Sequence, residues 1–201
     1  QVILPIYNGL GHVKRLLPKL CEDCQISQLY LIDDASTDLE VVRLLDEAAV
    51  RHPERVVLIR NENNLGFVKT VNKGLRLVTD DCVLLNSDVD VPPGWVGRLL
   101  EPIRRDPSVA TTTPFTNAGT LLSFPEWLTD NCVFNHLPVE AIDAQFQKLR
   151  YVEPIPELPT GVGFAMGMSL AAIREVGLFD EATFGRGYGE ENDWSQRAVH
   201  M

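Results

Sequence analysis

The chain has 201 residues, of which 45% are hydrophobic and 23% charged, and its formal net charge is −10. This length predicts one domain with a core of its own, because a chain of this size buries roughly 70% of its extended surface on folding. The negative charge argues against a nucleic-acid or anionic-membrane surface, since both need a basic face. A phosphate ligand would need a cation as mediator.

The cysteines indicate neither a zinc site nor a redox motif. Cys21 and Cys24 form one CxxC pair, whereas Cys82 and Cys132 stand alone without a second pair at ligand spacing. The acidic residues that flank the pair would raise a thiol pKa. We therefore expect reduced, structural cysteines in a reducing compartment.

The ends of the sequence suggest a piece of a longer chain. Gln1 already lies in an apolar run, and Met201 follows no helix stop signal. No apolar run approaches the roughly 18 residues of a membrane span. We expect a cytoplasmic excerpt, which would reach the inner face of a membrane only through parts outside this chain.

Short apolar runs alternate with amphipathic segments through the first half. The strands predicted from these runs cover residues 2–6, 29–33, 56–60, 82–86 and 109–113. The predicted helices cover residues 36–52, residues 68–78 and a stretch that starts at Pro93. In the first helix, Thr37 and Glu40 match a capping box, and Leu39, Val42 and Leu45 share one face. This alternation predicts an α/β fold with a mostly parallel sheet flanked by helices.

The second half is less regular. Pro138 opens a predicted helix with Val139, Ile142, Phe146 and Leu149 on one face, and the proline-rich residues 151–159 indicate a connector. Residues 160–181 predict a strand broken by glycines, followed by a short helix. We expect residues 1–201 to form a single domain.

Two of the predicted strands end in acidic pairs. Asp33 and Asp34 end one strand, and Asp88 and Asp90 follow another. Turn and cap chemistry explains either pair alone, but ligands of such sheets bind beyond the carboxyl ends of the strands. Two carboxylates on a short turn can hold one divalent cation together with substrate phosphates. An acidic site could then bind an anionic ligand through the metal.

The glycine-rich stretch "GRGYGEENDWSQRA", residues 185–198, carries a third acidic group. Capping of the following helix explains acids here, because they interact favourably with the helix dipole, and we assign Asp193 to that role. For the adjacent Glu190 and Glu191 a general base is plausible. Crowded carboxylates raise one another's pKa, which suits a base that works near neutral pH.

Taken together, these motifs resemble a known family. The stretches "VILPIYNG", "LIDDASTD", "NLGFVKTVNKG", "LLNSDVDVPPGW", "GLFDE" and "GYGEENDWSQRA" occur in the order seen in family 2 glycosyltransferases of the GT-A fold. The resemblance covers essentially the whole chain. It implies a nucleotide-binding half in residues 1–112 and an acceptor-binding half in residues 113–201.

The resemblance also implies roles for residues of the first half. Pro5 and Tyr7 match positions that line the base of the nucleotide. Asp34 matches the carboxylate that reads the edge of the base, with Asp33 beside it. Lys69 matches a basic position near the nucleotide.

The remaining roles concern metal and catalysis. Asp88 and Asp90 match the Asp-x-Asp that meets the ribose and the diphosphate-bound Mg²⁺ or Mn²⁺. Glu191 matches the acid position of the family's Glu-Asp pair, commonly the catalytic base. Because this pair reads Glu-Glu here, the resemblance leaves open whether Glu190 or Glu191 is the base. Residues 192–194 would support the base from the helix behind it.

The implied reaction is the inverting transfer of a sugar from a UDP-, dTDP- or GDP-sugar to a glycan or lipid-linked acceptor, in polysaccharide, O-antigen or cell-surface glycan assembly. Two alternatives stay open. One is a catalytically inactive module that binds nucleotide sugars. The other is a nucleotidyltransferase, which needs a basic glycine-rich loop after the first strand, where "PIYNGLGHVKR" is only a weak match. A haloacid-dehalogenase-type phosphatase is disfavoured, because Pro92 stands where that motif needs Thr or Val.

Overall fold

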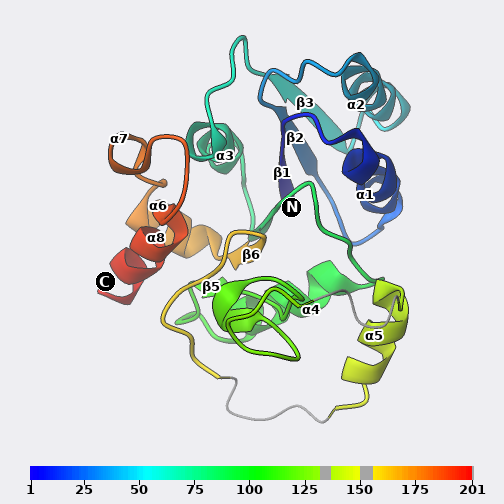
Figure 1. Cartoon of the computed structure of the whole chain (residues 1–201). Coiled ribbons are helices and arrows are strands. Elements are labelled where there is room, and N and C mark those ends of the chain that lie inside the picture. The colour runs from blue at the N-terminus through cyan, green and yellow to red at the C-terminus, as the bar shows by residue number, and fades with distance from the viewer. Residues whose placement is uncertain (132–136, 150–155, 201) are drawn as a thin grey trace.

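The computed structural model describes residues 1–131, 137–149 and 156–200 (Figure 1). Within them, the strands form one sheet in the order β3-β2-β1-β4-β6-β5. The strands are β1 (Val2–Ile6), β2 (Leu29–Asp33), β3 (Val56–Arg60), β4 (Cys82–Leu85), β5 (Thr111–Thr112) and β6 (Ala165–Met168). β1 to β4 run parallel, whereas β6 is antiparallel to both β4 and β5. The predicted mostly parallel α/β sheet is confirmed.

Helices cover both faces of this sheet (Figure 1). They are α1 (Leu10–Glu22), α2 (Leu39–Arg51), α3 (Phe67–Leu75), α4 (Trp95–Arg105), α5 (Val139–Phe146), α6 (Leu170–Val176), α7 (Glu181–Phe184) and α8 (Glu190–Val199), with a 3-10 turn at Thr120–Leu122. In the described part of the chain, no helix has both the length and the apolar character needed to cross a membrane.

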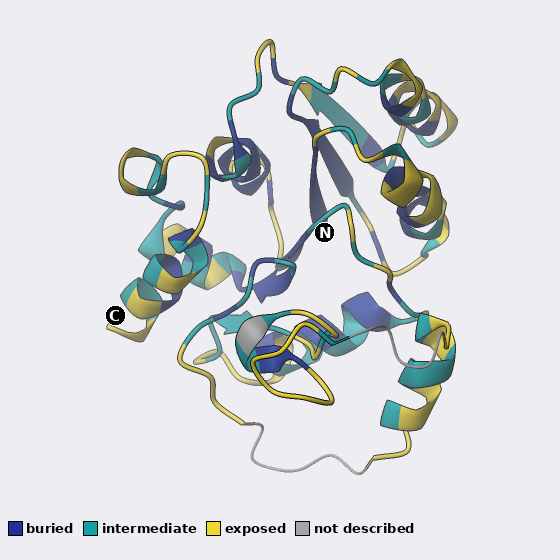
Figure 2. Cartoon of the chain, viewed as in Figure 1, coloured by how far each residue is buried: buried dark blue, intermediate teal, exposed yellow. Residues whose placement is uncertain are grey.

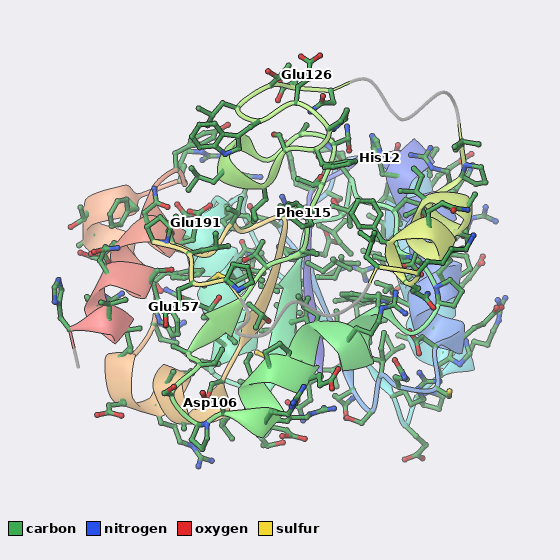
Figure 3. The ribbon with its side chains drawn as sticks, turned by 90° about the horizontal axis from the view of Figure 1, so that it is seen from below. His12, Asp106, Phe115, Glu126, Glu157 and Glu191 are labelled. Atoms are coloured by element: carbon green, nitrogen blue, oxygen red, sulfur yellow. The ribbon has the colours of Figure 1, made fainter. Side chains whose placement is uncertain are left out.

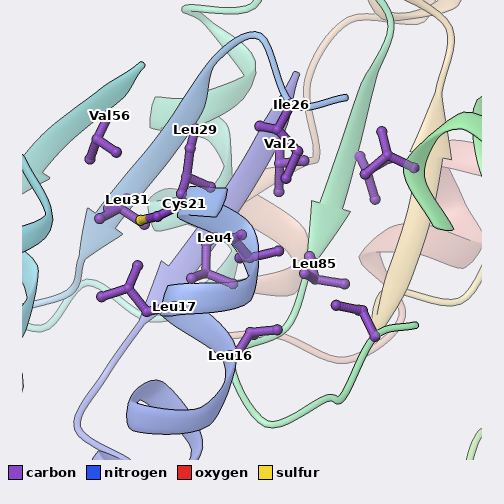
Figure 4. Packing of buried hydrophobic residues seen from close by; sticks show 14 of the residues in the cluster. Val2, Leu4, Leu16, Leu17, Cys21, Ile26, Leu29, Leu31, Val56 and Leu85 are labelled. Atoms are coloured by element: carbon purple, nitrogen blue, oxygen red, sulfur yellow. The ribbon is translucent and has the colours of Figure 1, made fainter. Parts of the chain in front are cut away.

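The core lies in two layers, one on each face of the sheet. Val2, Leu4 and Ile6 of β1 pack with α1, α2 and α4, as Figure 4 shows in part. Ile3 points to the opposite face and packs with α3, α6 and α8. Since alternate side chains of a strand point to opposite faces, β1 must be apolar at every position. β1 and β2 are accordingly buried along their length (Figure 2).

Some element boundaries differ from those predicted. The sequence analysis did not single out α1, in which an internal Pro18 obscures an otherwise regular buried stripe. α2 begins later than predicted and is capped by Asp38, which accepts a hydrogen bond from the Glu40 N–H at 2.9 Å, so the Thr37 capping box is wrong. Leu39 is 81% exposed and does not share the buried face.

Three other segments also differ. The strand predicted at 109–113 shortens to Thr111–Thr112. The helix predicted from Pro93 starts at Trp95, after Gly94 with a φ of 71°. The helix after Pro138 ends at Phe146. Residues 151–155 of the predicted connector lie outside the described residues.

The described cysteines are free thiols. Cys21 and Cys82 are buried and Cys24 is exposed, while Cys132 lies outside the described residues. Burial raises the pKa of Cys21, and it raises that of Cys82 to about 12. The largest cause at Cys21 is therefore burial and not the acidic flank that the sequence suggested.

Candidate active site

The predicted nucleotide side lies at the carboxyl ends of β2, β1 and β4, which are parallel neighbours in the sheet. Tyr7 follows β1 at this edge and is 52% exposed. Pro5 is buried within β1 and pairs in register with Ile32. Of these two predicted positions, Tyr7 is the one that offers a surface to a ligand.

Asp33 is the last residue of β2, and its side chain is buried. It is 1% exposed, and its carboxylate accepts hydrogen bonds from Arg60 Nε at 3.2 Å and from the Ser36 N–H at 2.9 Å. Arg60 also binds Asp46 at 2.9 Å. Asp33 thus ties β2 to the end of β3 and to the turn before α2.

Asp34 organises the loop that crosses this edge. Its Oδ1 accepts hydrogen bonds from Asn61 Nδ2 and from the Leu65 N–H, both at 2.7 Å. Its Oδ2 accepts one from the Gly66 N–H at 2.9 Å. The residue is 5% exposed. The carboxylate that we expected to read the base is therefore already bound to three donors of loop 61–66.

Lys69 is exposed on α3. The pKa of Glu181 is lowered chiefly by a hydrogen bond from Asn72, with further contributions from Arg76 and from the charge of Lys69. Lys69 is thus available at the surface, close to α7.

Asp88 and Asp90 are both exposed beyond β4, but their surroundings differ. Asp90 Oδ1 lies 2.7 Å from Lys19 Nζ, and this ammonium also lies 2.9 Å from Glu140 Oε1 on α5. Burial lowers the pKa of Lys19, but the bonds to Asp90 and Glu140 outweigh it, so that the pKa is raised. The carboxylate of Asp88 has no hydrogen-bond or ion-pair partner among the described residues.

In the part of the chain that the structure describes, the protein side chains do not form a complete metal-binding site by themselves. No group of three or more His, Cys, Asp or Glu side chains there is arranged to hold a metal ion. The exposed oxygens of Asp88 are nonetheless of the type that Mg²⁺ binds. Lys19 was missed by the sequence analysis, because a basic residue on α1 gives no local sign of a partner beyond β4.

The glutamates of α8 begin the helix after a turn of unusual backbone conformation. Gly187, Tyr188 and Gly189 all have positive φ, at 143°, 76° and 98°, and the Tyr188 side chain is 98% exposed. Glu190 is 3% exposed, whereas Glu191 is partly exposed. Burial, and next to it the neighbouring Glu191, raise the pKa of Glu190.

A short segment before β6 holds the start of α8. Thr160 donates to Asn192 at 2.8 Å, and the Gly161 N–H donates to Ser195 at 3.0 Å. The next contact reaches a glutamate, because the Gly163 N–H lies 3.4 Å from Oε1 of Glu191. The segment "TGVGFAMG", residues 160–167, is therefore attached by hydrogen bonds to the first turns of this helix.

The same segment also contacts the end of β4. The N–H of Asn86 donates to the Phe164 carbonyl at 2.9 Å, directly beside the Gly163 contact with Glu191. One dipeptide, Gly163–Phe164, thus touches both the strand end that precedes Asp88 and the glutamate of α8.

The residues after Glu191 support the helix. Trp194 is fully buried and donates to the Gly177 carbonyl at 2.8 Å. Asp193 pairs with Arg197 at 2.8 Å. Asp193 lies in the first turn of α8, where the helix dipole favours an acid, but its side chain makes an ion pair within the helix and no capping hydrogen bond.

An aromatic group lies in the second half of the chain. The rings of Phe115, Phe124 and Phe146 have centroid separations of 5.2–6.2 Å, and Phe115 is 63% exposed. Figure 3 shows Phe115 between Glu191 and His12 in that view. α5, which carries Phe146, buries none of its side chains.

Comparison with known proteins identifies the family. The sequence profile described as Glycosyl transferase family 2 matches residues 1–177. The chain belongs to this family. The resemblance predicted from the motifs is confirmed.

Curated relatives are transferases that match over part of their length. The undecaprenyl-phosphate 4-deoxy-4-formamido-L-arabinose transferase of Edwardsiella ictaluri is 30% identical over 106 residues, which cover 50% of this chain and 32% of the relative. Its counterpart from Aeromonas hydrophila is 33% identical over 106 residues, with the same coverage. The match thus spans about a third of the length of these relatives.

Solved structures show the same fold. GalNAc-T7, crystallised with UDP, GalNAc and Mn²⁺, superposes with a TM-score of 0.72 at 18% identity and covers 98% of this chain and 40% of its own. The mannosyltransferase PcManGT from Pyrobaculum calidifontis, in complex with GDP-Man and Mn²⁺, gives 0.67 at 16% identity, covering 98% of this chain and 50% of its own. The predicted GT-A fold is confirmed.

Proposed function

We propose that this chain is the catalytic domain of an inverting glycosyltransferase that uses a nucleotide-sugar donor. The observation that supports this most directly is the Gly163–Phe164 dipeptide, which contacts both the end of β4 and Glu191. A diphosphate bound beyond β4 would lie near a carboxylate able to take a proton. Membership of the family supports the same reaction class.

The nucleotide would bind to residues 1–112, at the carboxyl ends of β1 and β2. Tyr7 and Lys69 are exposed and could touch the base or the phosphates. Pro5, Asp33 and Asp34 are buried and would shape the surface beneath the nucleotide. The solved structures with the same fold contain UDP or GDP-Man, which supports a nucleoside-diphosphate sugar as the donor.

Asp88 and Asp90 would hold the Mg²⁺ or Mn²⁺. Asp88 fits this role because its carboxylate is exposed and without a partner among the described residues. Asp90 would have to exchange the Lys19 ammonium for the cation. The bound cation would offset negative charge on the departing diphosphate, a contribution worth several kcal/mol. Two neighbouring structures that contain Mn²⁺ support a divalent ion.

The glutamate pair of α8 would supply the base. Glu191 or Glu190 takes the proton of the acceptor hydroxyl, whose oxygen attacks the anomeric carbon opposite the leaving group. The new carbon–oxygen bond forms as the bond to the diphosphate oxygen breaks, and its electron pair leaves with the diphosphate. A single displacement inverts the anomeric carbon. Such a base typically contributes about 10²–10⁴-fold to the rate.

The acceptor would bind to residues 113–201. The exposed ring of Phe115, packed against Phe124 and Phe146, offers an apolar face for a sugar or a lipid-linked acceptor. The curated relatives are named for undecaprenyl-phosphate, which supports a lipid-linked acceptor. We place the reaction at the cytoplasmic side of the membrane, in the assembly of polysaccharide, O-antigen or another cell-surface glycan.

A donor screen tests this function. The chain is incubated with UDP-, dTDP- and GDP-sugars with and without Mn²⁺, and both its melting temperature and the released nucleoside diphosphate are measured. We expect one nucleotide class to stabilise the protein only when metal is present. Glu191→Gln should nearly abolish turnover while donor binding survives. Binding without turnover in the unsubstituted chain would indicate an inactive module, and stabilisation by no donor would refute the proposal.

A further inference from the structure

Two oxygen atoms of consecutive residues at the start of α8 have no hydrogen-bond partner among the described residues. Oε2 of Glu190 and Oε2 of Glu191 are both buried, and neither accepts a hydrogen bond from any described residue. Buried polar atoms are rarely left this way, because the lost hydration is not replaced. The pair therefore needs a proton donor that the rest of the described chain does not supply.

The two carboxyl groups belong to consecutive residues, and the pKa of Glu190 is raised chiefly by burial and further by the charge of Glu191 and by its side chain as a hydrogen-bonding neighbour. Two ionised carboxylates cannot form a hydrogen bond with each other, since each can only accept, and two buried like charges repel. One proton shared between Glu190 and Glu191 turns the two unpaired acceptors into a donor and an acceptor. It also leaves a single negative charge at the N-terminus of α8, where the helix dipole favours it.

The surroundings of the two groups decide where the proton resides. Glu190 is 3% exposed, and burial raises its pKa. The backbone N–H groups of Glu190 itself and of Tyr188 lower the pKa, but by less than burial raises it. The charge of Glu191 raises it further. Glu191 is partly exposed and accepts from the Gly163 N–H, which suits a charged carboxylate.

We propose that Glu190 carries a proton at neutral pH and donates it in a hydrogen bond to Glu191, which makes Glu190 a positioning residue and Glu191 the base. The bond would hold the Glu191 side chain against Gly163, facing the acceptor. This inference rests on the proposed function in naming Glu191 as the base. The shared proton itself does not depend on that function.

Kinetics of three variants test the assignment. Glu190→Gln keeps a neutral donor of the same shape, so it should lower kcat by less than about tenfold, whereas Glu190→Ala should lower it about a hundredfold through misplacement of the base. Donor KM should stay within about twofold in both, because the base acts on the acceptor. Glu191→Gln should lower kcat by about 10²–10⁴-fold. The opposite ranking of the two glutamine variants, or equal losses in both, would overturn the assignment.

Infrared spectroscopy tests the proton without any turnover. At pH 7 the intact chain should show the carbonyl stretch of a protonated carboxyl group, and Glu190→Gln should remove it. The control is Glu181→Gln, which removes a glutamate paired with Arg76 at 3.0 Å and should leave the band in place. Absence of the band, or its persistence in Glu190→Gln, would refute the shared proton. If no donor is turned over but the band behaves as expected, the proposed function fails and the shared proton stands.

The pH dependence of unfolding provides a second test. Because the pKa of Glu190 is raised in the folded state, the native protein loses stability as pH rises from the ordinary value of 4.5 through the raised value. Glutamine does not titrate. The melting temperature of Glu190→Gln relative to the unsubstituted chain should therefore increase over this window, by about 2–4 °C. A difference that is constant with pH would contradict the proposal.

Discussion

Replacement of Asp34 by asparagine tests whether this carboxylate supports the fold as the structure indicates. Its Oδ1 binds Asn61 and Leu65 and its Oδ2 binds the buried Gly66 N–H. Asparagine keeps one acceptor oxygen, which is best placed at the position with two donors. Its NH₂ group then faces the Gly66 N–H, and water cannot replace the lost acceptor there.

The magnitude follows from that single lost bond. A hydrogen bond to a charged group contributes about 1.5–3 kcal/mol, and leaving a buried donor unpaired adds to the cost. We expect Asp34→Asn to lower the free energy of unfolding by about 3 kcal/mol, a large part of the about 5–15 kcal/mol typical of a domain. Urea unfolding followed by tryptophan fluorescence measures this change.

The matched control is Asp38→Asn. Asp38 also accepts a backbone hydrogen bond, from Glu40 at 2.9 Å, but it is a helix cap, where asparagine is equally good. We expect a change below about 0.5 kcal/mol there. If Asp34→Asn unfolds within about 1 kcal/mol of the unsubstituted chain, the reasoning from its three donors is refuted. A variant of normal stability that loses nucleotide affinity would instead assign Asp34 to direct recognition of the base.

Two further substitutions test the site. Asp88→Asn removes the unpartnered carboxylate beyond β4, so Mn²⁺-dependent nucleotide binding, measured by calorimetry, should weaken by about tenfold or more; equal affinity would exclude Asp88 as a ligand. Gly163→Ala would place a methyl group 3.2 Å from Oε1 of Glu191. It should lower kcat by about 10–100-fold, with a stability loss of about 1 kcal/mol, and unchanged turnover would show that this contact does not position the base.

Controls for these variants come from the same chain. Asp106→Asn changes an exposed aspartate that follows the end of α4 (Figure 3), and it should leave metal-dependent binding intact. Gly11→Ala adds a methyl group at an exposed position of α1, where the nearest atom, Arg15 Nη1, is 3.9 Å away. It should stabilise the protein by up to about 1 kcal/mol.

β1, β2 and β4 were predictable because burial on both faces requires uninterrupted apolar runs. β1 to β4 begin where the sequence analysis placed them, and only β4 ends one residue early. Prediction failed where local signals conflict with packing. In α1, Pro18 penalises a helix that is nevertheless stabilised by Leu16, Leu17 and Leu20 in the core.

The sequence alone also determined where the acidic groups stand, since Asp34, Asp88 and the glutamates of α8 follow recognisable strand ends and a glycine-rich turn. Only the tertiary structure decided what each carboxylate can do. Asp34 is satisfied by a loop about 30 residues further on, and Asp90 is held by Lys19, which lies 71 positions earlier. Burial separates Glu190 from Glu191 although they are adjacent in the chain. The physical reason is that a carboxylate's charge and availability depend on its donors and its exposure to water, and contacts between distant segments set both.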